Sequence, residues 1–138
     1  MIRGGNDVFS RQGSLWLFYA QFNGRGASNG ACAPILRADG GQLCKDLTFT
    51  RTGAGLYTLQ HVPPAPSAVN QGFPSILSVL GALRSAAFTL AQFTPGVYTP
   101  STGTITMKIT TPSTAAAYDP VNGETIELLL SIANSVVP

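Results

Sequence analysis

Glycine, proline and small hydroxyl residues divide this sequence into short segments, and this punctuation limits the fold more than any other feature. The chain has 15 glycines, 10 prolines, 14 threonines and 11 serines, which together make up 50 of its 138 residues. These residue types favour turns and short strands over long helices. Because 44% of the chain is hydrophobic and only 10% is charged, it has enough apolar surface to offset the ordering entropy. A single, mostly β domain is therefore expected.

The clearest local pattern is a β-hairpin in the middle of the chain. Residues 47–51 and 56–61 each alternate between two sides of a strand, and a glycine-containing turn at 52–55 joins them. Leu47, Phe49 and Arg51 share one side of the first strand, and Tyr57, Leu59 and His61 share one side of the second. His61 is interpreted as a polar residue at the end of its strand. A proline cluster after His61 ends the pairing, because proline donates no ladder hydrogen bond.

Several other segments are predicted to form strands. They are residues 14–22, 33–37, 76–80, 87–93, 97–99, 104–110 and 124–134. Helical spacing competes in 74–87 and in 124–134, where alternation and the surrounding turns favour strand. Gly81 is expected to end one strand, and Thr-Pro-Gly at 94–96 is expected to form a turn between two others.

These segments predict an all-β fold, with residues 14–138 forming one antiparallel β-sandwich or a jelly-roll-like barrel. The predicted core consists of Trp16, Phe18, Phe49, Tyr57, Leu59, Ile105, Met107, Ile109, Ile126, Leu128 and Leu130. Residues 1–13 lack any apolar period and are expected to form a flexible N-terminal arm. Glu127 is expected on the outward side of the last strand, solvated or at an interface.

No catalytic or metal-binding constellation is apparent in the sequence. Six carboxylates, one histidine and two cysteines supply neither a nucleophile motif nor the four ligands of a typical metal site. Asp119 precedes Pro120 and is interpreted as a turn former. Cys32 and Cys44 are expected to be reduced thiols, and the alternative is a disulfide between them, which a hairpin would allow. The sequence therefore predicts a protein that is not an enzyme and has no cofactor.

Charge and hydropathy also exclude two classes of partner. The basic residues are scattered, which disfavours nucleic-acid binding. No apolar run reaches the ~18–20 residues of a membrane helix, and residues 1–7 lack the apolar stretch of a signal peptide. A weakly charged surface instead favours association with other proteins. The expected partner contacts lie in the arm and the C-terminal tail, at Met1, Ile2, Arg3, Val8, Phe9, Arg11, Val136 and Val137.

Three segments together resemble a known class of proteins. They are RTGAGLYTL at 51–59, the threonine-rich strand at 104–110, and NGETIEL at 122–128 followed by SIANSV at 131–136. In these segments the chain resembles small virion structural proteins of tailed bacteriophages. The resemblance implies a capsid decoration (cement) subunit that binds the outer capsid and stabilises contacts between major capsid subunits. The alternative that it implies is a tail, fibre or head-spike structural or adhesion module.

The same resemblance implies the partners and the location of the protein. The partners would be the major capsid protein and further copies of this chain, as a trimer or a dimer. The protein would be assembled in the host cytoplasm and lie on the outer capsid surface of the virion. The arm is expected to become ordered only against a neighbour, because Ile2, Val8 and Phe9 show no period that would place them in a regular element.

Overall fold

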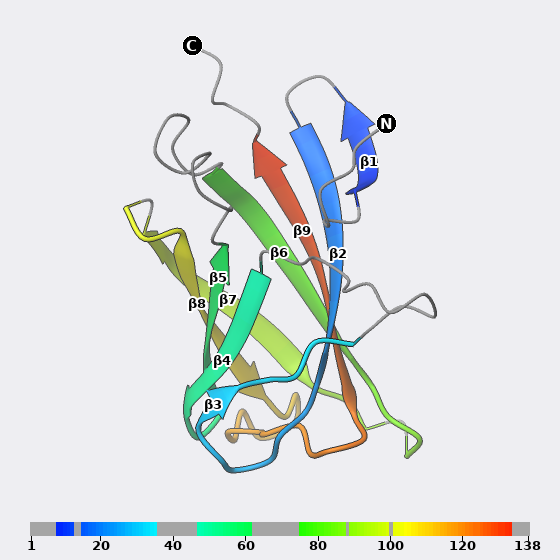
Figure 1. Ribbon diagram of the computed structural model, residues 1–138. Helices are drawn as coiled ribbons and strands as arrows, with labels where there is room; N and C mark the ends of the chain where they lie inside the picture. Colours follow the sequence, from blue (N-terminus) through cyan, green and yellow to red (C-terminus); the bar gives the residue numbers. More distant parts are fainter. Residues whose placement is uncertain are drawn as a thin grey trace.

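The computed structural model describes residues 8–12, 15–35, 47–61, 75–87, 89–99 and 101–133, and within this part of the chain every regular element is a strand (Figure 1). The strands are β1 (Val8–Gln12), β2 (Leu15–Asn23), β3 (Gly30–Ala31), β4 (Leu47–Gly53), β5 (Leu56–His61), β6 (Ser75–Arg84), β7 (Gln92–Thr99), β8 (Thr104–Thr110) and β9 (Thr125–Ala133). They form a four-stranded sheet in the order β1-β2-β9-β6 and a five-stranded sheet in the order β3-β4-β5-β8-β7. All pairs are antiparallel, and the two sheets pack as a sandwich, which confirms the predicted fold class.

The core lies between the two sheets and follows the predicted alternation. In β4, β5, β8 and β9 the inward residues are buried and most of their neighbours along the strand are more exposed. The predicted core residues that the structure confirms are Phe49, Tyr57, Leu59, Ile105, Met107, Ile109, Ile126, Leu128 and Leu130. Trp16 and Phe18 lie in β2, but their side chains are outside the described part.

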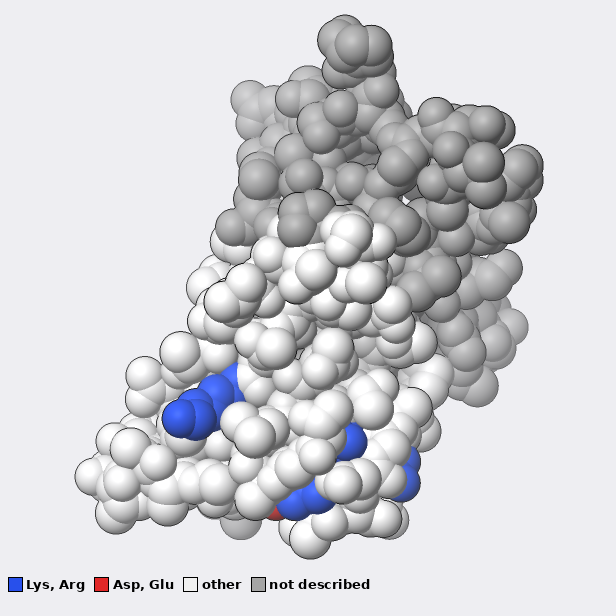
Figure 2. Space-filling view, turned by 90° about the vertical axis from the view of Figure 1, so that its left-hand side faces the viewer, with Lys and Arg blue, Asp and Glu red and all other residues white. Residues whose placement is uncertain are grey.

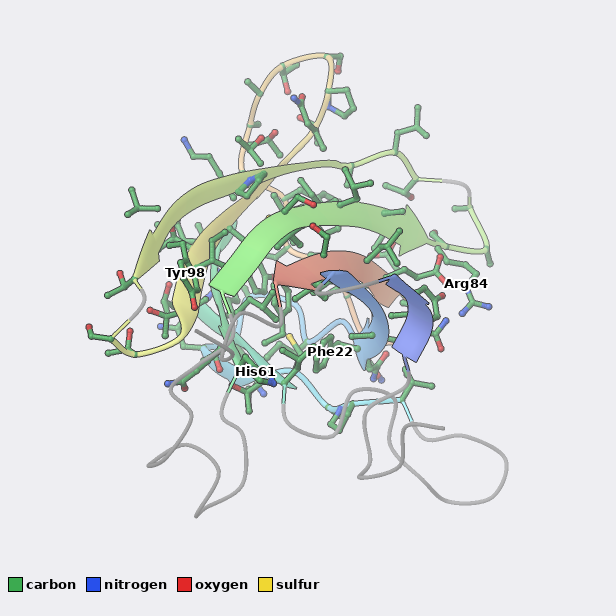
Figure 3. All side chains as sticks on the ribbon, turned by 90° about the horizontal axis from the view of Figure 1, so that it is seen from above. Phe22, His61, Arg84 and Tyr98 are labelled. Carbon is green, nitrogen blue, oxygen red and sulfur yellow. The ribbon has the colours of Figure 1, made fainter. Side chains whose placement is uncertain are left out.

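Aromatic stacking connects the sheets at the centre of this core. The rings of Phe22 from β2 and Phe49 from β4 lie 5.6 Å apart, and those of Phe49 and Tyr57 lie 4.9 Å apart, nearly parallel. Figure 3 shows Phe22 and His61 inside the sandwich, and both are buried. Phe22 was not among the predicted core residues, although it shares a strand side with the predicted Trp16 and Phe18.

The structure corrects the prediction that Gly81 ends a strand. β6 continues from Ser75 through Gly81 to Arg84 and pairs with β9 along this length. A Cβ atom on Gly81 would lie 2.4 Å from Cγ of Phe93 in β7. The glycine therefore gives room for a ring at the corner where the two sheets meet, a packing role that glycine inside a strand often has.

The predicted turn at 94–96 is also wrong. β7 runs without interruption from Gln92 to Thr99, and its pairing with β8 shifts register between Pro95 and Tyr98. Because β7 is an edge strand, Pro95 needs no partner for the N–H group that it lacks. The irregularity that the sequence suggested is therefore a bulge within one strand.

The N-terminal region contains a regular element that the prediction denied. Residues 8–12, at the end of the predicted arm, form β1 and pair antiparallel with β2, with Val8 beside Phe18 and Gln12 beside Leu15. The edge of β2 offers unpaired backbone groups, and ladder hydrogen bonds need no side-chain period. Residues 1–7 lie outside the described residues.

The segment after β2 differs from the predicted strand at 33–37. The two-residue β3 pairs with β4, and one isolated bridge joins Phe22 to Pro34. Pro34 donates no backbone hydrogen bond, which restricts longer pairing. Residues 36 and 37 lie outside the described part.

Candidate functional site

The most connected polar group of the described residues is the carboxylate of Asp119, in the connection between β8 and β9. Arg51 of β4 binds it through two nitrogens, with Nε–Oδ1 and Nη2–Oδ2 distances of 2.9 Å. The backbone N–H of Gly55 and the hydroxyl of Tyr57 also donate to Oδ1, at 2.8 and 3.2 Å. Arg51 donates from Nη1 to the side-chain oxygen of Asn29 as well. We call Arg51, Gly55, Tyr57 and Asp119 the internal cluster.

Electrostatics in the internal cluster favour the ionised form of both Arg51 and Asp119. Hydrogen bonds from Arg51, with support from Gly55, hold the pKa of Asp119 below its usual range. Burial raises the pKa of Tyr57, and the negative charge of Asp119 adds to this effect. The three donors to Asp119 belong to β4, to β5 and to the turn between them, so the cluster ties the β8–β9 connection to the β4–β5 hairpin. No part of it resembles a general base poised to accept a proton.

The sequence motif at 51–59 forms the hairpin side of this cluster. Gly55 has a φ of +64°, and a Cβ atom there would lie 2.7 Å from the carbonyl oxygen of Ile109. Its N–H can reach Asp119 because no side chain blocks this approach. The sequence interpretation of Asp119 as a turn former missed its pairing with Arg51. The available signal was the place of Arg51 on the same strand side as the predicted core residue Phe49, since a buried guanidinium needs an anionic or hydrogen-bonding partner.

Glu124 organises the second half of the same connection. Its carboxylate is buried and accepts hydrogen bonds from the Tyr118 hydroxyl at 2.8 and 3.0 Å and from the Val121 N–H at 2.8 Å. Its carbonyl oxygen accepts from the N–H of Gly24, at the end of β2. Glu124 therefore also serves to fold the loop.

The remaining reactive side chains do not assemble into a site. Among the described residues, no three His, Cys, Asp or Glu side chains group so that they could hold a metal ion. His61 is buried at the end of β5, where its backbone N–H donates to the backbone carbonyl of Gly103. Cys32 is a buried free thiol, and burial raises its pKa to about 11, so it stays protonated at neutral pH. Cys44 lies outside the described residues.

The outer face of the four-stranded sheet gathers a different set of residues. Its described members are Tyr19, Gln21, Asn23, Ser78, Leu80, Ala82, Arg84, Thr125, Glu127, Leu129 and Ser131. Strand register aligns them in rows across β2, β9 and β6, and one row consists of Tyr19, Leu129 and Leu80. The next row consists of Gln21, Glu127 and Ala82. An apolar row therefore lies directly beside a polar one.

Glu127 is the centre of the polar row. Its Oε2 accepts hydrogen bonds from the Tyr19 hydroxyl and, at 2.9 Å, from Gln21, and it lies 3.5 Å from Nη2 of Arg84. Burial raises the pKa of Glu127, but the hydrogen bonds and the Arg84 charge outweigh it and hold the pKa below its ordinary value. The sequence analysis placed Glu127 on the outward side correctly, and the structure adds its neighbours.

Two grooves are lined by residues of this face, and both include Glu127. The first, of about 200 Å³, is lined by Tyr19, Leu80, Gly81, Ala82, Glu127, Leu128 and Leu129. The second, of about 300 Å³, is lined by Leu83, Arg84, Ser85, Thr89, Leu90 and Glu127. Leu80 and Leu90 project from the groove rims, with 66% and 74% of their surface exposed.

The outer face of the five-stranded sheet is lined mainly by threonine. Its members are Thr48, Thr50, Leu56, Thr58, Gln60, Thr94, Thr104, Thr106 and Lys108. Figure 2, which faces this side of the molecule, shows few charged side chains among the described residues. A groove of about 370 Å³ lies where β7 bulges away from β8, next to Pro95 and Thr106.

The predicted contact residues lie at one end of the four-stranded sheet or outside the described part. Val8, Phe9 and Arg11 belong to β1, whose backbone alone is described. Met1, Ile2, Arg3, Val136 and Val137 fall outside it. Leu15 of β2 lies between Gln12 of β1 and Ala133 of β9. The strands that lead to the arm and to the tail therefore meet at the same end of the sheet (Figure 1).

Comparison with known proteins finds no relative. No family model matches this sequence, and no curated protein or solved structure matches it. In the part of the chain that is described, no helix has the length and apolarity of a membrane span.

Proposed function

We propose that this protein is a non-enzymatic structural component of a virion, a capsid decoration subunit that binds the outer capsid and stabilises contacts between major capsid subunits. The observation that carries the proposal is the use of the buried charged groups. Arg51, Asp119 and Glu124 all bond within the chain, where they fix the β8–β9 connection. The buried charged side chains among the described residues thus hold the β8–β9 connection in place.

The outer surfaces support the same role. Large apolar side chains that are about half or more exposed occur on both sheets and on the loops, at Leu56, Leu80, Leu90, Val97 and Val121. A rigid sandwich presents such side chains in fixed positions, which lowers the ordering cost of binding a protein surface. A weakly charged surface is unfavourable for a free monomer, but it is tolerated in a subunit that stays bound to a capsid.

The arm and tail are proposed to hold the capsid. β1 and the end of β9 pair with opposite edges of β2, with Gln12 and Ala133 both beside Leu15. The strand that contains Val8, Phe9 and Arg11 therefore lies at the same end of the sheet as the point where β9 ends. A partner that contacts this end of the sheet can engage both segments. Leaving large apolar side chains in water forgoes about 1.5–3 kcal/mol for each one that could be buried.

The first test is the copy number of the protein in purified virions, measured by quantitative mass spectrometry against the major capsid protein. A decoration subunit is expected at a copy number of the same order as the major capsid protein. A copy number far below that level contradicts decoration and supports a tail, fibre or spike module instead.

The second test is capsid occupancy of two truncated chains. Removal of residues 1–9 is expected to abolish binding to capsids that lack the protein, because it removes five of the eight proposed contact residues and two of the five residues of β1. Removal of residues 1–7 is the matched variant, since it keeps all of β1 and isolates the contribution of Met1, Ile2 and Arg3. Circular dichroism checks that both variants stay folded. Wild-type occupancy after removal of residues 1–9 contradicts the role of the arm.

A further inference from the structure

We propose that the outer face of the four-stranded sheet joins two copies of this chain around a two-fold axis. The inference deepens the self-association expected under the proposed function by naming its surface and symmetry. A two-fold contact uses the same patch on both subunits, so each patch must contain both members of every complementary pair. This face meets that requirement in shape and in charge.

The shape of the face is self-complementary. Leu80 projects at the end of the row that contains Tyr19 and Leu129, and a groove of about 200 Å³ lies beside it. Leu90 projects beside the second groove, of about 300 Å³. Ala82, an exposed small residue that lines the first groove, lets a facing copy approach closely. Each copy therefore offers projecting leucines and the hollows that can receive them.

The charges on the face are self-complementary as well. Arg84 has 62% of its side chain exposed, and Figure 3 shows it at the rim of the molecule. The Glu127 carboxylate accepts from Tyr19 and Gln21 and lies near Arg84 of its own chain. Its side chain is 25% exposed, so a donor from a facing copy can also reach it. Two-fold apposition places Arg84 of each copy near Glu127 of the other.

The opposite face does not meet these conditions. Among the described residues of the five-stranded sheet's outer face, Lys108 is the charged side chain and no carboxylate accompanies it. A two-fold contact through that face would bring like charges together. The polar rows there are threonine ladders, such as Thr50, Thr58 and Thr106 across β4, β5 and β8. This comparison selects the four-stranded sheet as the contact between copies.

The test is the oligomeric state of the full chain by analytical ultracentrifugation. The wild type is expected to sediment as two 14.4 kDa chains. Leu80→Arg should weaken the dimer by more than about tenfold in Kd, the effect of losing a central interface residue. Val97→Arg is the matched control, because Val97 is 74% exposed on β7 of the other sheet, and it should leave the dimer intact.

Several results would overturn the inference. They are a wild type that is monomeric or trimeric, a Leu80→Arg variant that dimerises normally, or a Val97→Arg variant that dissociates equally while both remain folded by circular dichroism. Copy number and capsid occupancy test the proposed function separately. A monomer that decorates capsids refutes only this inference, and a dimer through this face that is absent from virions refutes only the proposed function.

Discussion

Two carboxylates in this protein are surrounded by the same types of side chain, but the arginine beside one is buried and the arginine beside the other is exposed. Asp119 accepts from Arg51, Tyr57 and the N–H of Gly55. Glu127 accepts from Tyr19 and Gln21 and lies near Arg84. In each case a tyrosine, an arginine and a third donor surround one acidic group.

The difference lies in what surrounds the two groups. Arg51 is buried and donates to Asp119 through two parallel bonds, whereas Arg84 is mostly exposed and approaches Glu127 through one contact of 3.5 Å. Exposed ion pairs contribute little to stability, because water and salt screen them. The same chemistry therefore ties a loop in place where the arginine is buried, and it leaves a polar group available for a partner where the arginine is exposed.

The largest expected effect comes from removing each carboxylate in turn. Asp119→Ala should lower the free energy of unfolding by at least about 2 kcal/mol, because the N–H of Gly55 and the hydroxyl of buried Tyr57 lose their acceptor, at about 1–3 kcal/mol for each. Glu127→Ala should change it by no more than about 0.5 kcal/mol, as is usual on a surface. Urea unfolding measures both values. Equal effects would show that burial does not separate the two clusters.

The next effect concerns the glycine on which the internal cluster depends. Gly55→Ala should cost about 1–3 kcal/mol, because alanine must adopt a positive φ and its Cβ would lie 2.7 Å from the Ile109 oxygen. Gly53→Ala is the control two residues away, where the added Cβ meets only Leu56, at 3.6 Å. It should change stability by less than about 0.5 kcal/mol. Equal losses at both glycines would contradict the role given to Gly55.

The sequence predicts the hairpin and the strands at 104–110 and 124–134 because these segments alternate with a period of two. The rest depends on contacts between distant segments. Arg51 was placed on the same strand side as Phe49, but its pairing with Asp119, 68 residues away, follows from the order of strands in the sheets. The extension of β6 past Gly81 likewise depends on Phe93 of another strand. Local pattern specifies which residues face inward, and topology decides which of them meet.

The same reasoning explains what was missed outside the core. The sequence places Glu127 and Leu129 on the outward side of β9, and the neighbours of each come from β2 and β6. The apolar row and the grooves therefore appear only when the register is known. The contact residues of the arm and tail remain a prediction, because their side chains lie outside the described part.

A smaller effect is expected when acid titrates the two carboxylates in the wild-type chain. The folded-state pKa of Asp119 is lowered chiefly by its hydrogen bonds to Arg51, so the unfolded chain binds the proton more readily. The resulting stabilisation is complete above the ordinary carboxyl pKa of about 3.9 and is lost as the pH falls through the folded-state value. Unfolding by urea across this range should show the loss.

Asp119→Asn and Glu127→Gln identify which carboxylate causes the acid dependence. Asp119→Asn should flatten it more, because at Glu127 burial is the largest influence on the pKa and opposes the hydrogen bonds. A profile that Asp119→Asn leaves unchanged would mean that other carboxylates produce the acid loss.

The smallest expected effects come from the two tyrosine hydroxyls, and they compare the clusters most directly because the change is identical. Tyr57→Phe removes a buried donor to Asp119 and should lower the free energy of unfolding by about 1 kcal/mol. Tyr19→Phe removes a donor to Glu127, but Gln21 still donates to the same oxygen and water can replace the hydroxyl. Its effect should stay within about 0.5 kcal/mol. Phenylalanine keeps the ring and its packing in both variants, so unfolding curves report the hydroxyl alone. If Tyr19→Phe proves the more costly, the hydrogen bonds around Glu127 stabilise the four-stranded sheet itself. Glu127 then has a structural role of the same kind as Asp119.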